Sequence, residues 1–274
     1  MCSTCGCESG ENGITIKMMG ENNEVSEIIV EDNHHHHHHG HDHDHIHGHS
    51  HHHHHHHHEV NEVDLEKDIL SKNQLKAERN RGFFEALNIY SINMVSSPGS
   101  GKTSLLEKTI RDLKDKIELS VIEGDQQTSN DAERIHQSGV PVIQINTGKG
   151  CHLDSEMVSK SLKLLQPKPD SVLIIENVGN LVCPAMFDLG ESVRIVIVSV
   201  TEGEDKPIKY PDMFHTSQIC IINKIDLLPH LNFDLEKLKN YALQVNPEIK
   251  FFELSATTGE GMDKWYEFLQ KSIK

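Results

Sequence analysis

Residues 96–103, SSPGSGKT, have the residue types and spacing of a phosphate-binding loop. The two glycines of this motif allow backbone amides to face an anion, and a following helix N-terminus adds positive potential. Lys102 can reach the β- and γ-phosphates of a nucleoside triphosphate, and Thr103 can bind Mg²⁺. Ser96 stands where the motif has its first glycine, and a Gly-rich turn with an isolated lysine is the alternative. The predicted phosphate contacts are Gly99, Ser100, Gly101, Lys102, Thr103 and Ser104.

A second motif, residues 223–226 (NKID), can recognise guanine. The carboxylate of Asp226 would accept hydrogen bonds from the N1–H and amino groups of guanine, whereas adenine offers no matching donors. Residues 254–261, LSATTGEG, resemble the loop that closes over guanine in GTPases. The motifs together predict GTP as the nucleotide. The predicted base contacts are Asn223, Lys224, Asp226, Ser255 and Ala256.

Two acidic residues follow predicted strands and could reach the phosphates. Asp125 lies in EGDQQTSND and Glu176 lies in LIIENVGN. Either carboxylate could help to bind Mg²⁺ or orient the attacking water. The alternatives are a helix N-cap for Asp125 and a surface acid for Glu176. Together with Lys102, these two acids are the predicted catalytic residues.

Cysteine and histidine also occur next to these nucleotide motifs. Cys151 and His152 are adjacent in TGKGCHLD, and Cys183 lies in NVGNLVCP. Two thiolates and an imidazole suit Ni²⁺ or Zn²⁺, but a closed zinc site normally has four ligands. Water or a second copy of the chain could supply the rest. A packed cysteine or a surface histidine would be the explanation for any one of these residues alone.

The first sixty residues contain two further metal-binding candidates. Cys2, Cys5 and Cys7 form C-x-x-C-x-C and could enclose one ion by folding around it. Residues 34–58 hold 19 of the 23 histidines of the chain. A purification tag is the alternative, but this run is internal and interrupted by Gly, Asp, Ile and Ser. Because neutral imidazole binds nickel, zinc and copper, we interpret it as a nickel reservoir.

Composition limits the possible partners and compartment. The 274-residue chain has a formal net charge of −16 and 36% hydrophobic residues. An acidic chain is a poor partner for nucleic acid. Its apolar runs are too short for a membrane span, and we expect no signal peptide and a cytoplasmic protein. The six cysteines are then thiols or metal ligands and not disulfides.

Apolar segments rich in β-branched residues alternate with helical ones after residue 61. This alternation predicts a doubly wound α/β domain with a mostly parallel sheet, whose ligands bind beyond the carboxyl ends of the strands. We predict three parts: a disordered arm, 1–33; the His-rich segment, 34–60; and a nucleotide-binding domain, 61–274, with a leading helix at 63–87. Residues 24–31 are only weakly apolar, and no periodicity before residue 61 supports a packed domain. The predicted strands are 88–96, 118–124, 140–146, 170–177, 193–200, 217–223 and 250–255.

The motifs quoted above together resemble the HypB family, GTPases that assist nickel insertion into [NiFe]-hydrogenase. The resemblance covers about residues 80–274 and includes EGDQQTSNDA and ENVGNLVCP. It implies a SIMIBI-type fold, nucleotide-dependent dimerisation, and a Ni/Zn site at Cys151, His152 and Cys183. It also implies a small zinc-binding accessory protein and the hydrogenase large-subunit precursor as partners.

Two alternatives to this function stay open at the level of sequence. Urease-type nickel GTPases share the phosphate loop and often a His-rich arm, but they carry Cys-Pro-His where this chain has Cys151 and His152. A nickel-storage protein regulated by its nucleotide domain is the other alternative.

Overall fold

The computed structural model describes most of the chain after residue 61 and two short segments before it. The described residues are 14–19, 25–30, 62–125, 134–135, 137–148 and 150–273. The predicted metal-binding segments with Cys2, Cys5, Cys7 and the histidine run lie outside the described residues.

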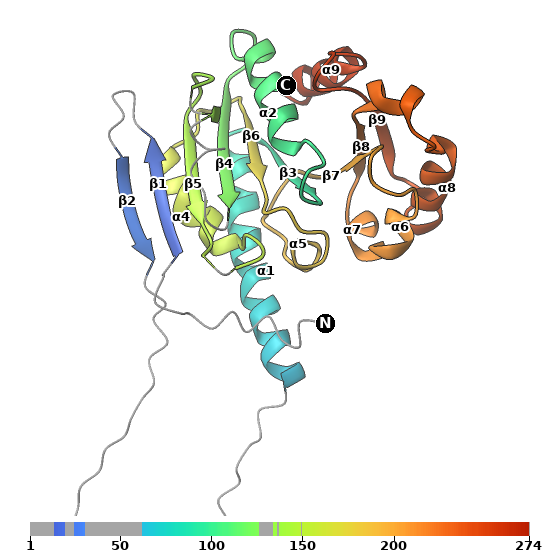
Figure 1. Cartoon of the computed structure of the whole chain (residues 1–274). Coiled ribbons are helices and arrows are strands. Elements are labelled where there is room, and N and C mark those ends of the chain that lie inside the picture. Colours follow the sequence, from blue (N-terminus) through green and yellow to red (C-terminus); the bar gives the residue numbers. More distant parts are fainter. Residues whose placement is uncertain are drawn as a thin grey trace, which may run out of the picture.

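One nine-stranded sheet organises the described residues, in the order β2-β1-β5-β4-β6-β3-β7-β8-β9 (Figure 1). All neighbouring pairs from β5 to β9 are parallel, because helices or long connections return the chain to the same end of the sheet. These strands match the predicted ones and confirm the doubly wound α/β fold. Their bounds are β3 Tyr90–Ser96, β4 Leu119–Asp125, β5 Val142–Asn146, β6 Val172–Glu176, β7 Val193–Ser199, β8 Ile219–Asn223 and β9 Lys250–Glu253.

A hairpin of two antiparallel strands, β1 (Ile14–Met19) and β2 (Val25–Val30), extends this sheet beyond β5. The sequence analysis expected no packed structure before residue 61, and the hairpin departs from that expectation. Its signal is weak because β1 is six residues long and pairs with β5, which is far away in the sequence. Ile16 of β1 is nevertheless fully buried against the core.

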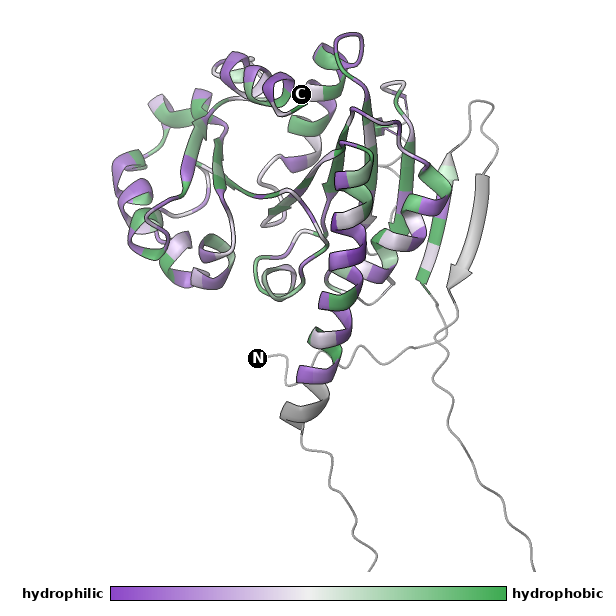
Figure 2. Cartoon of the chain, turned by 180° about the vertical axis from the view of Figure 1, so that it is seen from behind, coloured by the Kyte–Doolittle hydropathy of each residue, from purple (hydrophilic) through white to green (hydrophobic). Residues whose placement is uncertain are grey.

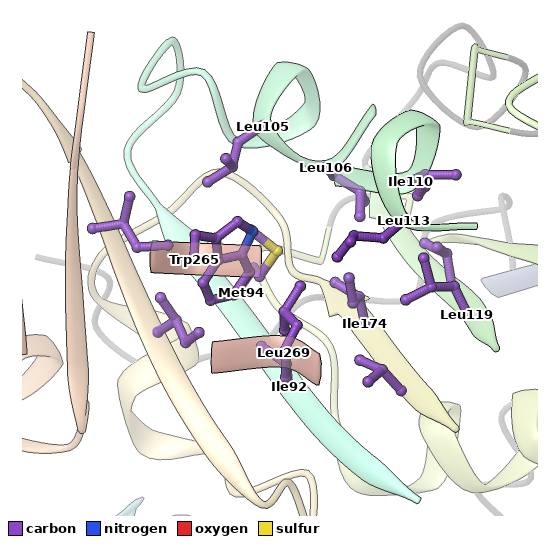
Figure 3. Packing of buried hydrophobic residues seen from close by; sticks show 14 of the residues in the cluster. Ile92, Met94, Leu105, Leu106, Ile110, Leu113, Leu119, Ile174, Trp265 and Leu269 are labelled. Carbon is purple, nitrogen blue, oxygen red and sulfur yellow. The ribbon is translucent and has the colours of Figure 1, made fainter. Parts of the chain in front are cut away.

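Helices cover both faces of the sheet. On one face, α2 (Lys102–Leu113) and α9 (Met262–Ser272) pack over the central strands. Figure 3 shows the centre of this layer, where Trp265 and Leu269 of α9 meet Met94 of β3. The amphipathic spacing of α2 explains the packing, because its buried side chains recur every three or four residues. They are Leu105, Leu106, Thr109, Ile110 and Leu113.

The opposite face carries α1 (Glu62–Ala86) and α4 (Ser155–Leu165), which pack against each other and the sheet. Figure 2 shows α1 running along the hydrophobic strands and extending beyond them at its N-terminal end. The observed bounds of α1 confirm the predicted leading helix. No helix among the described residues combines the length and apolar character needed to cross a membrane.

Short elements surround the β7–β9 end of the sheet and form a third apolar cluster with it. They connect strand ends that carry the predicted nucleotide and metal residues. Their bounds are α5 Cys183–Met186, α6 Lys206–Lys209, α7 Pro211–His215, η1 Ile225–His230 and α8 Leu235–Val245.

Candidate functional site

The phosphate loop joins the end of β3 to the start of α2. Gly99 and Gly101 have φ angles of 77° and 89°, in the left-handed region that favours glycine. Space also restricts Gly101, because an added Cβ would lie 2.5 Å from Nδ2 of Asn223. Ser96, at the position of the first motif glycine, is buried and donates its hydroxyl to the carbonyl of Ser97 over 2.8 Å. The substitution therefore fits the loop.

A cavity of about 460 Å³ lies between this loop and the carboxyl ends of β4 and β6. Glu176 lines it with only 2% of its surface exposed, so it is not a surface acid. One carboxylate oxygen, Oε1, lies 2.8 Å from Nζ of Lys102 and 2.7 Å from Oγ1 of Thr103. The other, Oε2, has no hydrogen-bond partner among the described residues. Asp125 lines the same cavity, so the structure brings all three predicted catalytic residues together.

The chemistry of this cavity suits Mg²⁺ and phosphate. Hydroxyl and carboxylate oxygens from Thr103, Asp125 and Glu176 are hard ligands of the kind that Mg²⁺ prefers. The unpaired Oε2 of Glu176 is a buried acceptor, which a cation or a bound water would satisfy.

The NKID motif contacts the phosphate loop directly. Asn223 donates from Nδ2 to the carbonyl of Ser100 over 3.0 Å, and its Oδ1 accepts from the backbone of Ala256 over 3.2 Å. Lys224 donates from Nζ to the carbonyl of Gly99 over 2.7 Å. Asn223 therefore fixes the base loops to the phosphate loop.

Asp226, the predicted guanine contact, follows directly on this junction. Its Oδ1 is buried and has no hydrogen-bond partner among the described residues. Ser255 orders the neighbouring loop, because its hydroxyl accepts from the backbone of Thr257 and Thr258 over 3.2 and 3.0 Å. Asp226 thus holds a buried acceptor without a partner among the described residues, in the motif that the sequence assigns to guanine.

The sequence analysis missed two charged residues that line this cavity and a third that contacts the phosphate loop. Glu123 of β4 lines the cavity and is the strand partner of Glu176, and Arg134 lies on the same wall. Lys206 donates to the hydroxyl of Ser97 over 2.9 Å. An acid inside the apolar strand VIEGD was an available signal for Glu123. No local pattern points to the other two, since the fold alone brings them to the loop.

The structure brings the predicted metal ligands together at the same edge of the sheet. The Sγ atom of Cys151 lies 2.7 Å from Sγ of Cys183 and 3.7 Å from Nδ1 of His152. The candidate ligand atoms of all three residues lie within 4.8 Å of one another. Two sulfurs and one imidazole nitrogen fit the preferences of Ni²⁺ and Zn²⁺.

Stacking fixes the orientation of the His152 imidazole, and burial favours its neutral form. The ring stacks on Phe187 with centroids 3.9 Å apart and an interplanar angle of 24°. Burial lowers the pKa of His152 from 6.5 to about 4, so the ring is neutral at pH 7, as a metal ligand must be. By contrast, burial raises the pKa of Cys220, which is fully enclosed in β8 and plays only a packing role.

One short loop, residues 177–182, links the nucleotide cavity to the metal ligands. It leaves β6 directly after Glu176 and reaches Cys183 at the start of α5. Gly179 packs on Pro98 of the phosphate loop, where an added Cβ would lie 3.4 Å away. Asn180 donates to the carbonyl of Cys151 over 3.5 Å. A structural change at the phosphate loop can therefore be transmitted through residues 177–182 to Cys151 and Cys183.

The fold and this cavity define a P-loop nucleotide-binding protein. The family model "CobW/HypB/UreG, nucleotide-binding domain" matches residues 91–253. The chain therefore belongs to the CobW/HypB/UreG family, in the HypB group of hydrogenase maturation factors.

Individual relatives support this assignment. The hydrogenase maturation factor HypB of Rhizobium leguminosarum is 59% identical over 77% of this chain and 70% of its own length. HypB of Escherichia coli is 55% identical over 76% and 72%. The crystal structure of HypB from Helicobacter pylori in complex with nickel aligns with a TM-score of 0.69 at 38% identity, covering 74% of this chain and 95% of that one.

Proposed function

We propose that this chain is a nickel-binding GTPase that assists insertion of nickel into [NiFe]-hydrogenase. The relatives that it resembles are named hydrogenase maturation factors, and one related structure holds nickel. The observation that carries the proposal is the loop of residues 177–182, which joins the acid at the phosphate cavity to a metal ligand.

GTP hydrolysis is the reaction that the cavity supports. Lys102 neutralises charge on the β- and γ-phosphates, and Asp226 selects guanine. Mg²⁺, held through Thr103 and a cavity acid, would supply further neutralisation of the phosphates. Asp125 and Glu176 are the candidates for orienting the attacking water, because both line the cavity beside the phosphate loop.

Nickel is the cargo of this cycle, and Zn²⁺ is the competing metal at the same ligands. The described triad offers three donors, and water or a second copy of the chain would supply the fourth ligand of a closed site. Val182 and Met186 are 56% and 41% exposed on either side of Cys183. Apolar exposure beside an incomplete metal site favours a homodimer that forms with GTP and holds nickel at its interface.

In this mechanism hydrolysis loosens the dimer site and releases nickel to a partner. The proposed partners are the small zinc-binding accessory protein and the hydrogenase large-subunit precursor, and the proposed compartment is the cytoplasm. A deletion strain tests this role. Loss of hydrogenase activity that excess nickel restores supports insertion, whereas normal hydrogenase maturation in the deletion strain contradicts it.

Nickel affinity in the two nucleotide states tests the coupling directly. A chain truncated near residue 61 would lose β1, so the full-length chain with Cys2, Cys5 and Cys7 changed to serine is the better protein. Nickel–thiolate absorbance in this background reports on Cys151 and Cys183, because histidine gives no such band. Nickel should bind differently with GDP and with a non-hydrolysable GTP analogue. Equal affinities would refute the coupling, and unchanged affinity in Cys151→Ala would place the metal elsewhere.

A further inference from the structure

A buried chain of polar side chains begins directly after Glu176. Asn177 is fully buried, and its backbone N–H donates to the carbonyl of Met94 over 3.0 Å. Because side chains alternate along a strand, Asn177 points to the sheet face opposite Glu176. The side chain of Asn177 therefore lies in the core, on the opposite face of the sheet from the phosphate cavity.

Asn177 connects this strand end to the loop that carries the first two metal ligands. Its Oδ1 accepts from the backbone N–H of Leu153, the residue after His152, over 3.2 Å. The side chain of Leu153 also packs on the backbone of Gly124, where an added Cβ would lie 2.8 Å away. Gly124 precedes Asp125 at the cavity, so two strands that end at the nucleotide site contact Leu153.

The other side of Asn177 leads to the segment that follows Cys183. Its Nδ2 donates to Oδ1 of Asn93 over 3.3 Å, and Asn93 donates to Oε1 of Glu191 over 3.0 Å. Glu191 pairs with Arg194 at 2.9 Å. The guanidinium of Arg194 donates over 3.1 Å to the carbonyl of Ala185 and over 2.8 Å to that of Phe187.

The ion pair between Glu191 and Arg194 fixes the direction of each hydrogen bond in this series of buried side chains. The amide nitrogen of Asn93 must face the carboxylate of Glu191, so its oxygen faces Asn177. Asn177 must then donate toward Asn93 and accept from Leu153. The carbonyl of Phe187 accepts from Arg194, and its ring stacks on His152, so this end of the series also contacts a candidate metal ligand. All four side chains of the relay are buried: Asn93, Asn177, Glu191 and Arg194.

We propose that Asn177 is the positioning residue that transmits nucleotide state to the metal ligands. A shift of Glu176 on phosphate binding moves Asn177, and the shared buried hydrogen bonds pass the shift to the His152 loop and to the segment after Cys183. Buried polar networks suit this role, since partial rearrangement leaves groups unsatisfied and so favours discrete arrangements. The inference rests on the proposed nickel-binding GTPase function.

Asn177→Asp provides the test with the smallest change of shape. The carboxylate keeps the acceptor for Leu153 but loses the donor to Asn93. Asn246→Asp is the matched control, because Asn246 also donates from its amide nitrogen to two backbone carbonyls, those of Phe214 and Ser217, and neither belongs to the relay. Arg194→Lys removes the hydrogen bonds to the carbonyls of Ala185 and Phe187, because lysine keeps the charge but lacks the planar, forked guanidinium.

The assay is nickel–thiolate absorbance in the full-length chain with serine at positions 2, 5 and 7, titrated with GDP and with the GTP analogue. Allosteric couplings are typically about 5- to 150-fold, and we expect a wild-type ratio in this range to fall below about twofold in Asn177→Asp and Arg194→Lys. Asn246→Asp should keep the ratio. Hydrolysis without nickel should stay near wild type in all three, which separates lost coupling from unfolding.

The outcomes distinguish the two proposals. A wild-type chain without nucleotide-dependent nickel affinity would defeat the proposed function together with the relay. A wild-type ratio that persists in both relay variants would defeat the relay alone. Equal loss in Asn246→Asp would also overturn it, because a substitution outside the relay would then have the same effect.

Discussion

Lys102 and Glu176 form an ion pair inside the nucleotide cavity, with 11% and 3% of their side chains exposed. We predict that Lys102→Ala lowers GTP turnover by about a hundredfold or more, because charge on the phosphates is no longer neutralised. The substitution also leaves a buried carboxylate without its cation, so a lower melting temperature is expected. Turnover should be measured below that temperature, with Lys264→Ala on α9 as a control. Retained turnover would disprove the role.

Asp226 is the residue proposed to recognise the base. We predict that Asp226→Asn weakens GTP binding and favours xanthosine triphosphate, because an amide can donate to the carbonyl that replaces the amino group of guanine. Oδ1 of Asp226 has no hydrogen-bond partner among the described residues, so the substitution breaks no described hydrogen bond of that atom. Competition binding with both nucleotides measures it. An unchanged preference would mean that NKID does not contact the base.

The element that most changes the expected architecture is the β1–β2 hairpin. We predict that Ile16→Ala destabilises the chain by about 2–5 kcal/mol, the usual range for a large buried aliphatic side chain. Ile16 is fully buried and packs in the same cluster as Ile143 and Ile145 of β5. Denaturant unfolding measures the lost free energy of unfolding, and Lys17→Ala, at a partly exposed position of the same strand, is the control. Equal stability of Ile16→Ala and wild type would indicate that the hairpin is not part of the folded unit.

Local sequence patterns predicted the strands from β3 to β9 and the phosphate loop, because long apolar runs and a Gly-rich turn are set by neighbouring residues. The hairpin was missed since its stability depends on the distant edge of β5. The approach of Cys151 to Cys183 was predictable, as both follow parallel strands that end at one edge. Phe187 and Asn177 were not, because their roles depend on packing between layers.

The hairpin also determines where the N-terminal segments join the whole molecule. Ile14 pairs with Val30, and Thr15 pairs with Asn146, which lies five residues before Cys151. The chain therefore enters and leaves the hairpin at the edge that carries the metal ligands. Residues 34–58 begin four positions after Val30, so the sequence attaches the histidine run to that edge.

A tethered reservoir raises the effective concentration of its ion near the second site without new contacts. We predict that replacing the histidines of residues 34–58 with Ser and Gly, at unchanged length to avoid strain on the hairpin, lowers the number of nickel ions bound per chain. GTP turnover should be unchanged, since the run lies outside the nucleotide domain. Equilibrium dialysis and a GTPase assay measure the two effects. In cells, hydrogenase activity should fall only when nickel is scarce, and a loss that persists in nickel-rich medium would make the run part of delivery itself.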